Sequence, residues 1–221
     1  MQSARFTRRI DPAAAALLAR LESLRALVTL PLVLGYRVTD RKSLIDEDVA
    51  HWLAVLQADD GERGLHSLLY AFREFRSLYY HRLEHGNASG ALLAFVMRRI
   101  WKPVDSLLLA TADIGPGLFI AHGSTTTLAA ERIGSNCYVH QGVTIGWDYR
   151  GERAPVIGDG VFIGTGAAIL GAITVGDGAR IGANAVVLQD VPAGATAVGV
   201  PARVLTPVDF AALDLDDLLL P

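Results

Sequence analysis

The stretch IGDGVFIGTGAAILGAITVGDGARIGANAVV, residues 157–187, has an aliphatic residue at every sixth position. A period of six fits neither an α-helix, with 3.6 residues per turn, nor a simple strand, with a period of two. It is typical of a β-solenoid, in which each hexapeptide forms one short strand and one turn. We therefore expect these side chains to point inward: Ile157, Ile163, Ile169, Val175, Ile181 and Val187.

The same interval continues upstream of this stretch. The first three positions with this interval are Ile114, Ile120 and Thr126. After one extra residue the interval resumes at Ile133, Val139 and Ile145. Gly151 stands where the next aliphatic residue is expected. We therefore interpret residues 147–155 as a loop that leaves the solenoid, and loops on a rigid scaffold often carry function.

Before residue 105 the apolar residues recur at helical spacing. Asp11 and Pro12 resemble a helix start, and Pro103 follows the last helical pattern. The helices are expected at about residues 12–28, 43–57, 65–83 and 89–101.

These two patterns predict an α+β fold. We expect an α-helical domain at residues 1–105, a parallel β-helix at 106–205 and a C-terminal tail at 206–221.

Composition excludes several classes of function. Of the 221 residues, 51% are hydrophobic and 19% are charged, which indicates a globular protein. The net charge of −3 gives no support for nucleic-acid binding. The apolar runs are too short for a membrane span, so a cytoplasmic protein is expected. Cys137 is the single cysteine, which rules out an intrachain disulfide and suggests a packing role.

Four stretches resemble the hexapeptide-repeat acyltransferases, and most closely their serine acetyltransferase-like branch. They are IGPGLFIAHG at residues 114–123, IGSNCYVHQGVTIG at 133–146, PVIGDGVFIGTGAAILG at 155–171 and VGVPAR at 198–203. The resemblance implies a left-handed β-helix, a homotrimer or dimer of trimers, and acetyl-CoA bound in a groove between adjacent solenoids. It implies no metal.

The resemblance also implies individual roles. His122 falls at the position of the catalytic histidine, a general base that takes the proton of an acceptor hydroxyl before direct acetyl transfer. An imidazole that titrates near neutral pH suits this chemistry. His140, one coil later, is expected to line the acceptor site. Arg153, in the extruded loop, is expected to pair with an acceptor carboxylate.

Two positions depart from serine acetyltransferases. Ala121, which is expected at the substrate-binding site, replaces an aspartate that precedes the catalytic histidine. Ala154 replaces a histidine that follows the loop arginine. These departures indicate that the acceptor need not be free serine. The expected acceptor is a small hydroxylated molecule: serine, a serine-like compound or, alternatively, a sugar of a surface polysaccharide. The tail ends in Pro221, whereas the family's sulfhydrylase-binding tail ends in isoleucine.

For acetyl-CoA the resemblance points to five residues. Gly146, Thr165 and Ala183 correspond to positions that face the pantetheine arm, and Arg180 or Arg203 would meet the phosphates.

Two further functions remain open. A zinc enzyme of the γ-carbonic anhydrase type shares the β-helix, but it needs three histidines, and the solenoid offers only His122 and His140. The other open function is that of a non-catalytic scaffold derived from a transferase.

Overall fold

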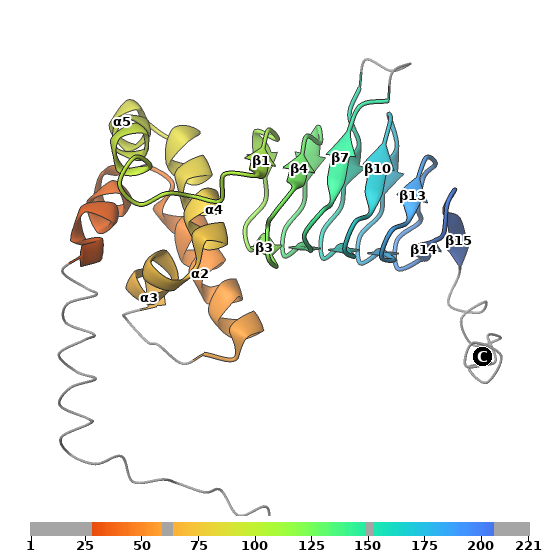
Figure 1. Ribbon diagram of the computed structural model, residues 1–221, viewed down its shortest axis with the longest axis horizontal. Coiled ribbons are helices and arrows are strands. Elements are labelled where there is room, and N and C mark those ends of the chain that lie inside the picture. The colour runs from red at the N-terminus through yellow and green to blue at the C-terminus, as the bar shows by residue number, and fades with distance from the viewer. Residues whose placement is uncertain (1–27, 59–63, 149–152, 206–221) are drawn as a thin grey trace, which may run out of the picture.

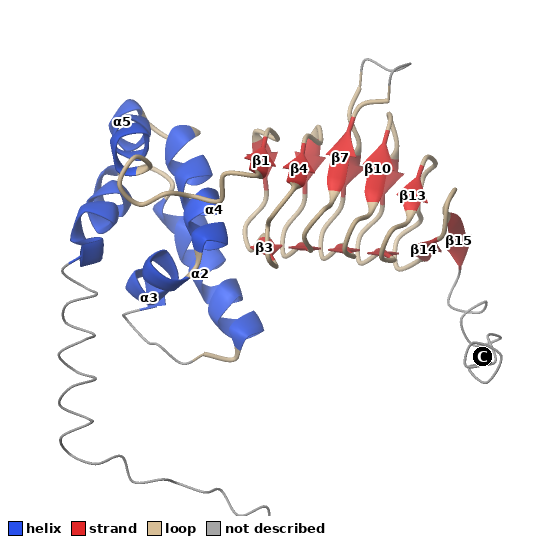
Figure 2. Cartoon of the chain, in the orientation of Figure 1, coloured by secondary structure: helices blue, strands red, loops and turns tan. Residues whose placement is uncertain are grey.

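The computed structural model describes residues 28–58, 64–148 and 153–205. Helices occupy the first part of the chain and strands the second, and the helices lie at one end of a row of stacked coils (Figures 1 and 2). Residues 28–38 are helical, and four helices follow: α2 Lys42–Leu56, α3 Gly64–Ala71, α4 Arg73–Glu84 and α5 Ala88–Met97. None of the helices in these ranges is both long and apolar enough to span a membrane.

The strands are short, as expected for hexapeptide repeats. They are β1 Leu107–Leu109, β2 Asp113–Ile114, β3 Phe119–Ile120, β4 Thr126–Leu128, β5 Arg132–Ile133, β6 Tyr138–Val139, β7 Thr144–Gly146, β8 Val156–Ile157, β9 Phe162–Ile163, β10 Ala168–Leu170, β11 Thr174–Val175, β12 Arg180–Ile181, β13 Val186–Val187, β14 Thr196–Val198 and β15 Arg203–Leu205.

From β1 to β13, successive strands fall in three sheets in turn, so each of these coils contributes one strand to each sheet, and β14 and β15 both join the third sheet. We call them the first sheet (β1-β4-β7-β10-β13), the second sheet (β11-β8-β5-β2) and the third sheet (β15-β14-β12-β9-β6-β3). Pairing is parallel throughout, except that β15 pairs antiparallel with β14. The predicted α+β fold, with helices followed by a parallel β-helix, is confirmed.

The interior is aliphatic, as the period of six predicted. All twelve predicted inward positions are buried, and the six between Ile157 and Val187 have no exposed surface. Burying an aliphatic side chain of this size contributes about 1.5–3 kcal/mol. Glycine is needed where coils approach closely: a Cβ atom on Gly164 would lie 2.7 Å from the backbone nitrogen of Ala183.

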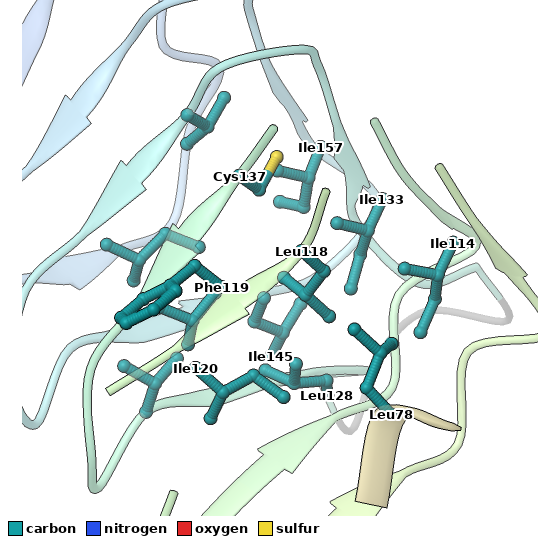
Figure 3. Close-up of a cluster of buried hydrophobic side chains, with 14 of the residues drawn as sticks. Leu78, Ile114, Leu118, Phe119, Ile120, Leu128, Ile133, Cys137, Ile145 and Ile157 are labelled. Carbon is teal, nitrogen blue, oxygen red and sulfur yellow. The ribbon is translucent and has the colours of Figure 1, made fainter. Parts of the chain in front are cut away.

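The helices close the first end of the solenoid. Leu78 of α4 lies beside Leu128 and Ile114 at this end of the apolar interior (Figure 3). The indole of Trp52, on α2, donates a hydrogen bond of 2.8 Å to the carbonyl of Leu118 and lies 4.4 Å from the Phe119 ring. The helical part and the β-helix therefore share one hydrophobic core.

A buried ion pair also joins the two parts. Arg82 of α4 holds both carboxylate oxygens of Asp48 on α2, at 2.9 and 3.1 Å. It also donates to the carbonyls of Ile114 and Gly115 in the first coil. The amide of Gly117 donates to Asp48 at 2.7 Å. Burial raises the pKa of Asp48, and Arg82 and the amide oppose that shift.

The structure corrects the helix predictions in three places. The helix expected at residues 65–83 is two helices, because Phe72 has an extended backbone. Its ring packs on Trp52, and Arg76 donates to the freed carbonyls of Leu69 and Tyr70. The helix expected at 89–101 ends at Met97.

The third correction concerns the start of the described chain. The structure has a helix at residues 28–38, whereas the first predicted helix ends at about residue 28. The part of the first predicted helix before residue 28, and the tail at 206–221, lie outside the described residues.

We expect His81 to make stability depend on pH. Burial lowers the pKa of His81 to about 4, below its ordinary value near 6.5. The unfolded chain therefore binds a proton between these values that the folded chain does not. The free energy of unfolding should fall as the pH drops from 6.5 toward 4, by up to about 1.4 kcal/mol per unit from this residue.

Urea unfolding at pH 7 and pH 5 checks this expectation. His51 and His66 also have pKa values lowered by burial, so wild type and His81→Gln must be compared. The variant should lose less stability between the two pH values. Equal losses would contradict the assignment to His81.

Candidate functional site

Two edges of the solenoid carry the residues singled out in the sequence. The His122 edge is where the third sheet passes to the first, at residues 121–125, 140–143, 164–167 and 182–185. The loop edge is where the first sheet passes to the second, at residues 129–131, 147–155 and 171–173. The full width of the first sheet separates the two edges.

His122 lies on a two-residue extension of its edge. Ile120 pairs with Val139 and Leu128 pairs with Ile145, so eight residues in the first coil match six in the next. The inward residue equivalent to Ile145 is thus Leu128, whereas the period of six had pointed to Thr126. The hydroxyl of Thr126 instead accepts from the amide of Gly142 at 3.0 Å and helps to hold the longer turn.

The extension presents the imidazole of His122 to solvent. The residue is exposed and has a φ of 56°, a left-handed conformation that non-glycine residues seldom adopt. The hydroxyl of Ser124 donates to its carbonyl at 3.1 Å. Among the described residues its ring takes part in no hydrogen bond and no ion pair, so both ring nitrogens are available to a substrate.

The structure brings three other predicted residues to the same edge. His140 is half-buried one coil later, and its ring centroid lies 5.1 Å from that of Tyr138 and 5.4 Å from that of Phe162. Thr165 and Ala183 follow at the same edge in the next two coils. This column can line an extended ligand beside His122.

Ala121 shares the edge but turns away from solvent. It is 9% exposed, and its amide donates to the carbonyl of Val139 at 2.8 Å. Ala154, the second position that departs from the family, is 7% exposed. Both methyl groups are largely covered within one chain.

Arg153 lies on the loop edge, and Gly146 directly precedes that edge. Gly146 ends β7, where an added Cβ atom would meet no atom within 4 Å. One guanidinium nitrogen of Arg153 lies 3.3 Å from each carboxylate oxygen of Glu131. A single chain therefore does not bring Arg153 to His122.

The connection of residues 147–155 interrupts the repeat, as predicted. Thr144 pairs with Ala168, and Ala168 in turn pairs with Val186. The coil that begins at Thr144 is therefore longer than the one that begins at Ala168, and the extra chain falls in this connection.

The two predicted phosphate-binding arginines lie elsewhere. Arg180 is on the outer side of the third sheet, with its guanidinium carbon 5.3 Å from the centre of the Phe162 ring. Arg203, on β15, lines a cavity of about 340 Å³ together with Leu188, Gln189 and Val200. Neither belongs to the His122 edge.

Cys137 is a packing residue. It is fully buried, and burial raises the pKa of its thiol to about 11, so the nucleophilic thiolate is scarce at neutral pH. Within the described ranges, no group of three or more His, Cys, Asp or Glu side chains is placed to hold a metal ion.

Sequence reasoning missed one acidic residue at the His122 edge. Glu74, in the first turn of α4, lies against the extension. No spacing in the sequence connects it to His122, because the two are far apart in the chain and belong to different kinds of structure. Its position follows only from the packing of α4 on the first coil.

Known proteins share both the repeats and the helical part. The family model described as bacterial transferase hexapeptide (six repeats) matches residues 154–189. The serine acetyltransferase of Synechocystis sp. is 36% identical over 172 residues, which cover 74% of this chain and 68% of that protein. The Helicobacter pylori strain J99 enzyme of the same name is 37% identical over 69% of this chain and 92% of that protein.

Solved structures agree with these relatives. Serine acetyltransferase of Neisseria gonorrhoeae in complex with serine has a TM-score of 0.58 and 34% identity, and the match covers 73% of this chain and 68% of that one. A serine acetyltransferase in complex with CoA has a TM-score of 0.57 and 29% identity over 79% of this chain and 74% of that one. With an exposed histidine on a hexapeptide β-helix, and with relatives matched over most of their length, the chain is an acyltransferase that belongs to the serine acetyltransferase family.

Proposed function

We propose that the chain is an acetyl-CoA-dependent O-acetyltransferase in which His122 is the general base. The observation that carries this proposal is the two-residue extension, which holds an exposed imidazole at the head of a column formed by His140, Thr165 and Ala183. Among the predicted site residues, these three are the ones that one chain places in a row with His122, where a single extended ligand can contact them all.

The chemistry follows from the properties of the groups. A hydroxyl attacks a thioester well only when its proton is removed as the new bond forms. The Nε2 or Nδ1 atom of His122 takes that proton, and the hydroxyl oxygen attacks the thioester carbonyl of acetyl-CoA. The C–S bond then breaks, the acetyl group stays on the acceptor oxygen, and the thiolate of CoA recovers the proton from the imidazolium.

The assembly we propose is a homotrimer, or a dimer of such trimers. His122 and Arg153 lie on different edges of one solenoid, so a site that uses both needs the His122 edge of one copy and the loop edge of another. CoA then lies between adjacent solenoids, as the family resemblance implies. Light scattering of the purified chain tests this assembly, and a monomer at assay concentration would contradict it.

The acceptor we propose is serine or a serine-like molecule that carries both a hydroxyl and an acidic group. Arg153 supports the acidic group, since a guanidinium can hold a carboxylate with two hydrogen bonds. Its present contact with Glu131 is exposed and therefore weak, so a substrate carboxylate can replace it. Ala121 and Ala154 replace two polar side chains of serine acetyltransferases, which favours a serine-like acceptor whose shape differs from that of serine.

An acceptor screen tests the proposed function. The full chain is incubated with acetyl-CoA and a thiol-reactive dye, and serine, homoserine, other hydroxylated acids and neutral sugars are compared. Release of CoA that depends on a hydroxylated acid supports the proposal. Release that depends only on neutral sugars favours the polysaccharide alternative, and no binding of CoA in calorimetry favours a non-catalytic scaffold.

Arg153→Lys is expected to raise the KM for an acidic acceptor by about 10-fold, because an ammonium cannot reproduce the two-pronged contact. The affinity for CoA should change little. Steady-state kinetics with each substrate varied in turn separate the two effects. Arg132→Lys is a matched control, since Arg132 lies in the exposed pair with Asp113. Equal effects of the two changes would contradict the role of Arg153.

A further inference from the structure

The extension that carries His122 is in contact with the helical part of the chain. Helix α4 packs against β1 and β3, the strands of the first coil that flank this edge (Figure 1). Gly123 follows His122 in this longer turn. A Cβ atom built on it would lie 3.1 Å from the Cδ2 atom of Leu107 and 3.4 Å from the Cγ atom of Glu74. The stem of Glu74 therefore lies close to the residue next to His122.

No side chain among the described residues pairs with the carboxylate of Glu74. Glu74 is half-buried in the first turn of α4, where the helix dipole favours a negative charge. Within the described part of the chain it forms no hydrogen bond and no ion pair within 4 Å, and the same holds for the ring of His122.

Two other charged groups near this edge, Asp105 and Arg76, have partners of their own. Asp105, ahead of β1, lies 3.3 Å from Arg73. Arg76 donates its guanidinium hydrogens to the carbonyls of Leu69, Tyr70 and Lys102 and feels the charge of Glu74 only at longer range. His140 stands one coil below and offers no carboxylate. Of the acidic groups Asp105 and Glu74, Glu74 is the one whose stem lies against the extension and which has no hydrogen bond or ion pair among the described residues.

A general base of this kind benefits from a carboxylate partner. The partner accepts a hydrogen bond from one ring nitrogen, which leaves the other nitrogen unprotonated and directed at the hydroxyl. It also stabilises the imidazolium that forms when the proton arrives. By the family resemblance, Ala121 stands where serine acetyltransferases have a carboxylate beside this histidine. Leu107, whose side chain also lies close to Gly123, has no carboxylate either.

We propose that Glu74 is the positioning residue for His122, a carboxylate supplied by the helical part to the base on the β-helix. This inference rests on the proposed role of His122. It also gives the helical part a function in catalysis beyond capping the solenoid, because the orientation of the base then depends on how α4 sits on β1 and β3.

Glu74→Gln tests the inference, since it removes the charge and preserves the shape. With the best acceptor from the screen, we expect kcat to fall about 10-fold to 100-fold while the KM for acetyl-CoA stays near the wild-type value. A carboxylate favours the protonated form of a neighbouring imidazole. Its loss should therefore move the acidic limb of the pH profile of kcat/KM to lower pH, and Glu74→Asp should restore part of kcat.

Glu84→Gln is the matched control, because Glu84 lies at the other end of α4 and pairs with Arg98. It should keep the wild-type pH profile. A Glu74→Gln enzyme whose profile coincides with wild type, or whose only change is in acceptor KM, would overturn the inference. His122→Ala separates the two proposals: if it abolishes activity while Glu74→Gln leaves the profile unchanged, His122 remains the base and Glu74 is not its partner.

Discussion

His122→Ala is expected to lower kcat by about 100-fold or more with the best acceptor, the usual scale for loss of a general base. The imidazole lies exposed on its extension and has no hydrogen bond or ion pair among the described residues. Its removal should therefore leave the thermal midpoint and the binding of CoA nearly unchanged. Initial rates of thiol release, measured at saturating acetyl-CoA over a range of pH, give the comparison.

His66→Asn provides the histidine control for this experiment. His66 lies in α3, where its Nδ1 atom is 2.7 Å from the hydroxyl of Thr29, and it has no part in the His122 edge. We expect this variant to retain most of the wild-type kcat. A folded His122→Ala enzyme with an unchanged rate would remove His122 from the mechanism, and with it the pairing to Glu74.

Arg82→Met is expected to lower the free energy of unfolding by about 3–5 kcal/mol, because it leaves the carboxylate of Asp48 buried without its partner. The two side chains are each 2% exposed, so water cannot replace the lost contacts. The carbonyls of Ile114 and Gly115 also lose their donor. Urea unfolding followed by far-ultraviolet circular dichroism measures the loss as a lower midpoint.

Arg98→Met is the matched comparison, since Arg98 pairs with Glu84 at the surface and the two side chains are 45% and 34% exposed. Exposed pairs contribute about 0–1 kcal/mol. The change at Arg98 should therefore cost far less than the change at Arg82. Similar losses for the two variants would mean that the buried pair does not hold α2 and α4 to the first coil.

The helix boundaries were harder to predict from the sequence than the coils of the β-helix. Helical periodicity located α2 within one residue at each end, but it could not reveal the break at Phe72. That break depends on the packing of the Phe72 ring on Trp52 and on the guanidinium of Arg76, which satisfies the carbonyls before it. These contacts join residues whose spacing in the sequence has no regular pattern.

The catalytic role of His122 stays a prediction from the motif around it, and the structure adds that the residue is exposed. The length of its turn did not follow from counting, because Thr126 keeps the interval of six although Leu128 is the residue in register with Ile145. Side chains in a hexapeptide strand alternate in and out, so a shift by two residues preserves the apolar pattern.

The sequence by itself determined the β-helix, since each coil repeats the same short-range requirement: an aliphatic residue inside and a small residue at the turn. Only the tertiary structure decided which residues meet at the His122 edge. It placed Arg153 on a different edge, and it brought Glu74 of α4 against Gly123. These contacts depend on how the helices pack on the first coil and on how many residues are inserted in each turn. Neither produces a periodic pattern in the sequence, because the residues involved are far apart in the chain.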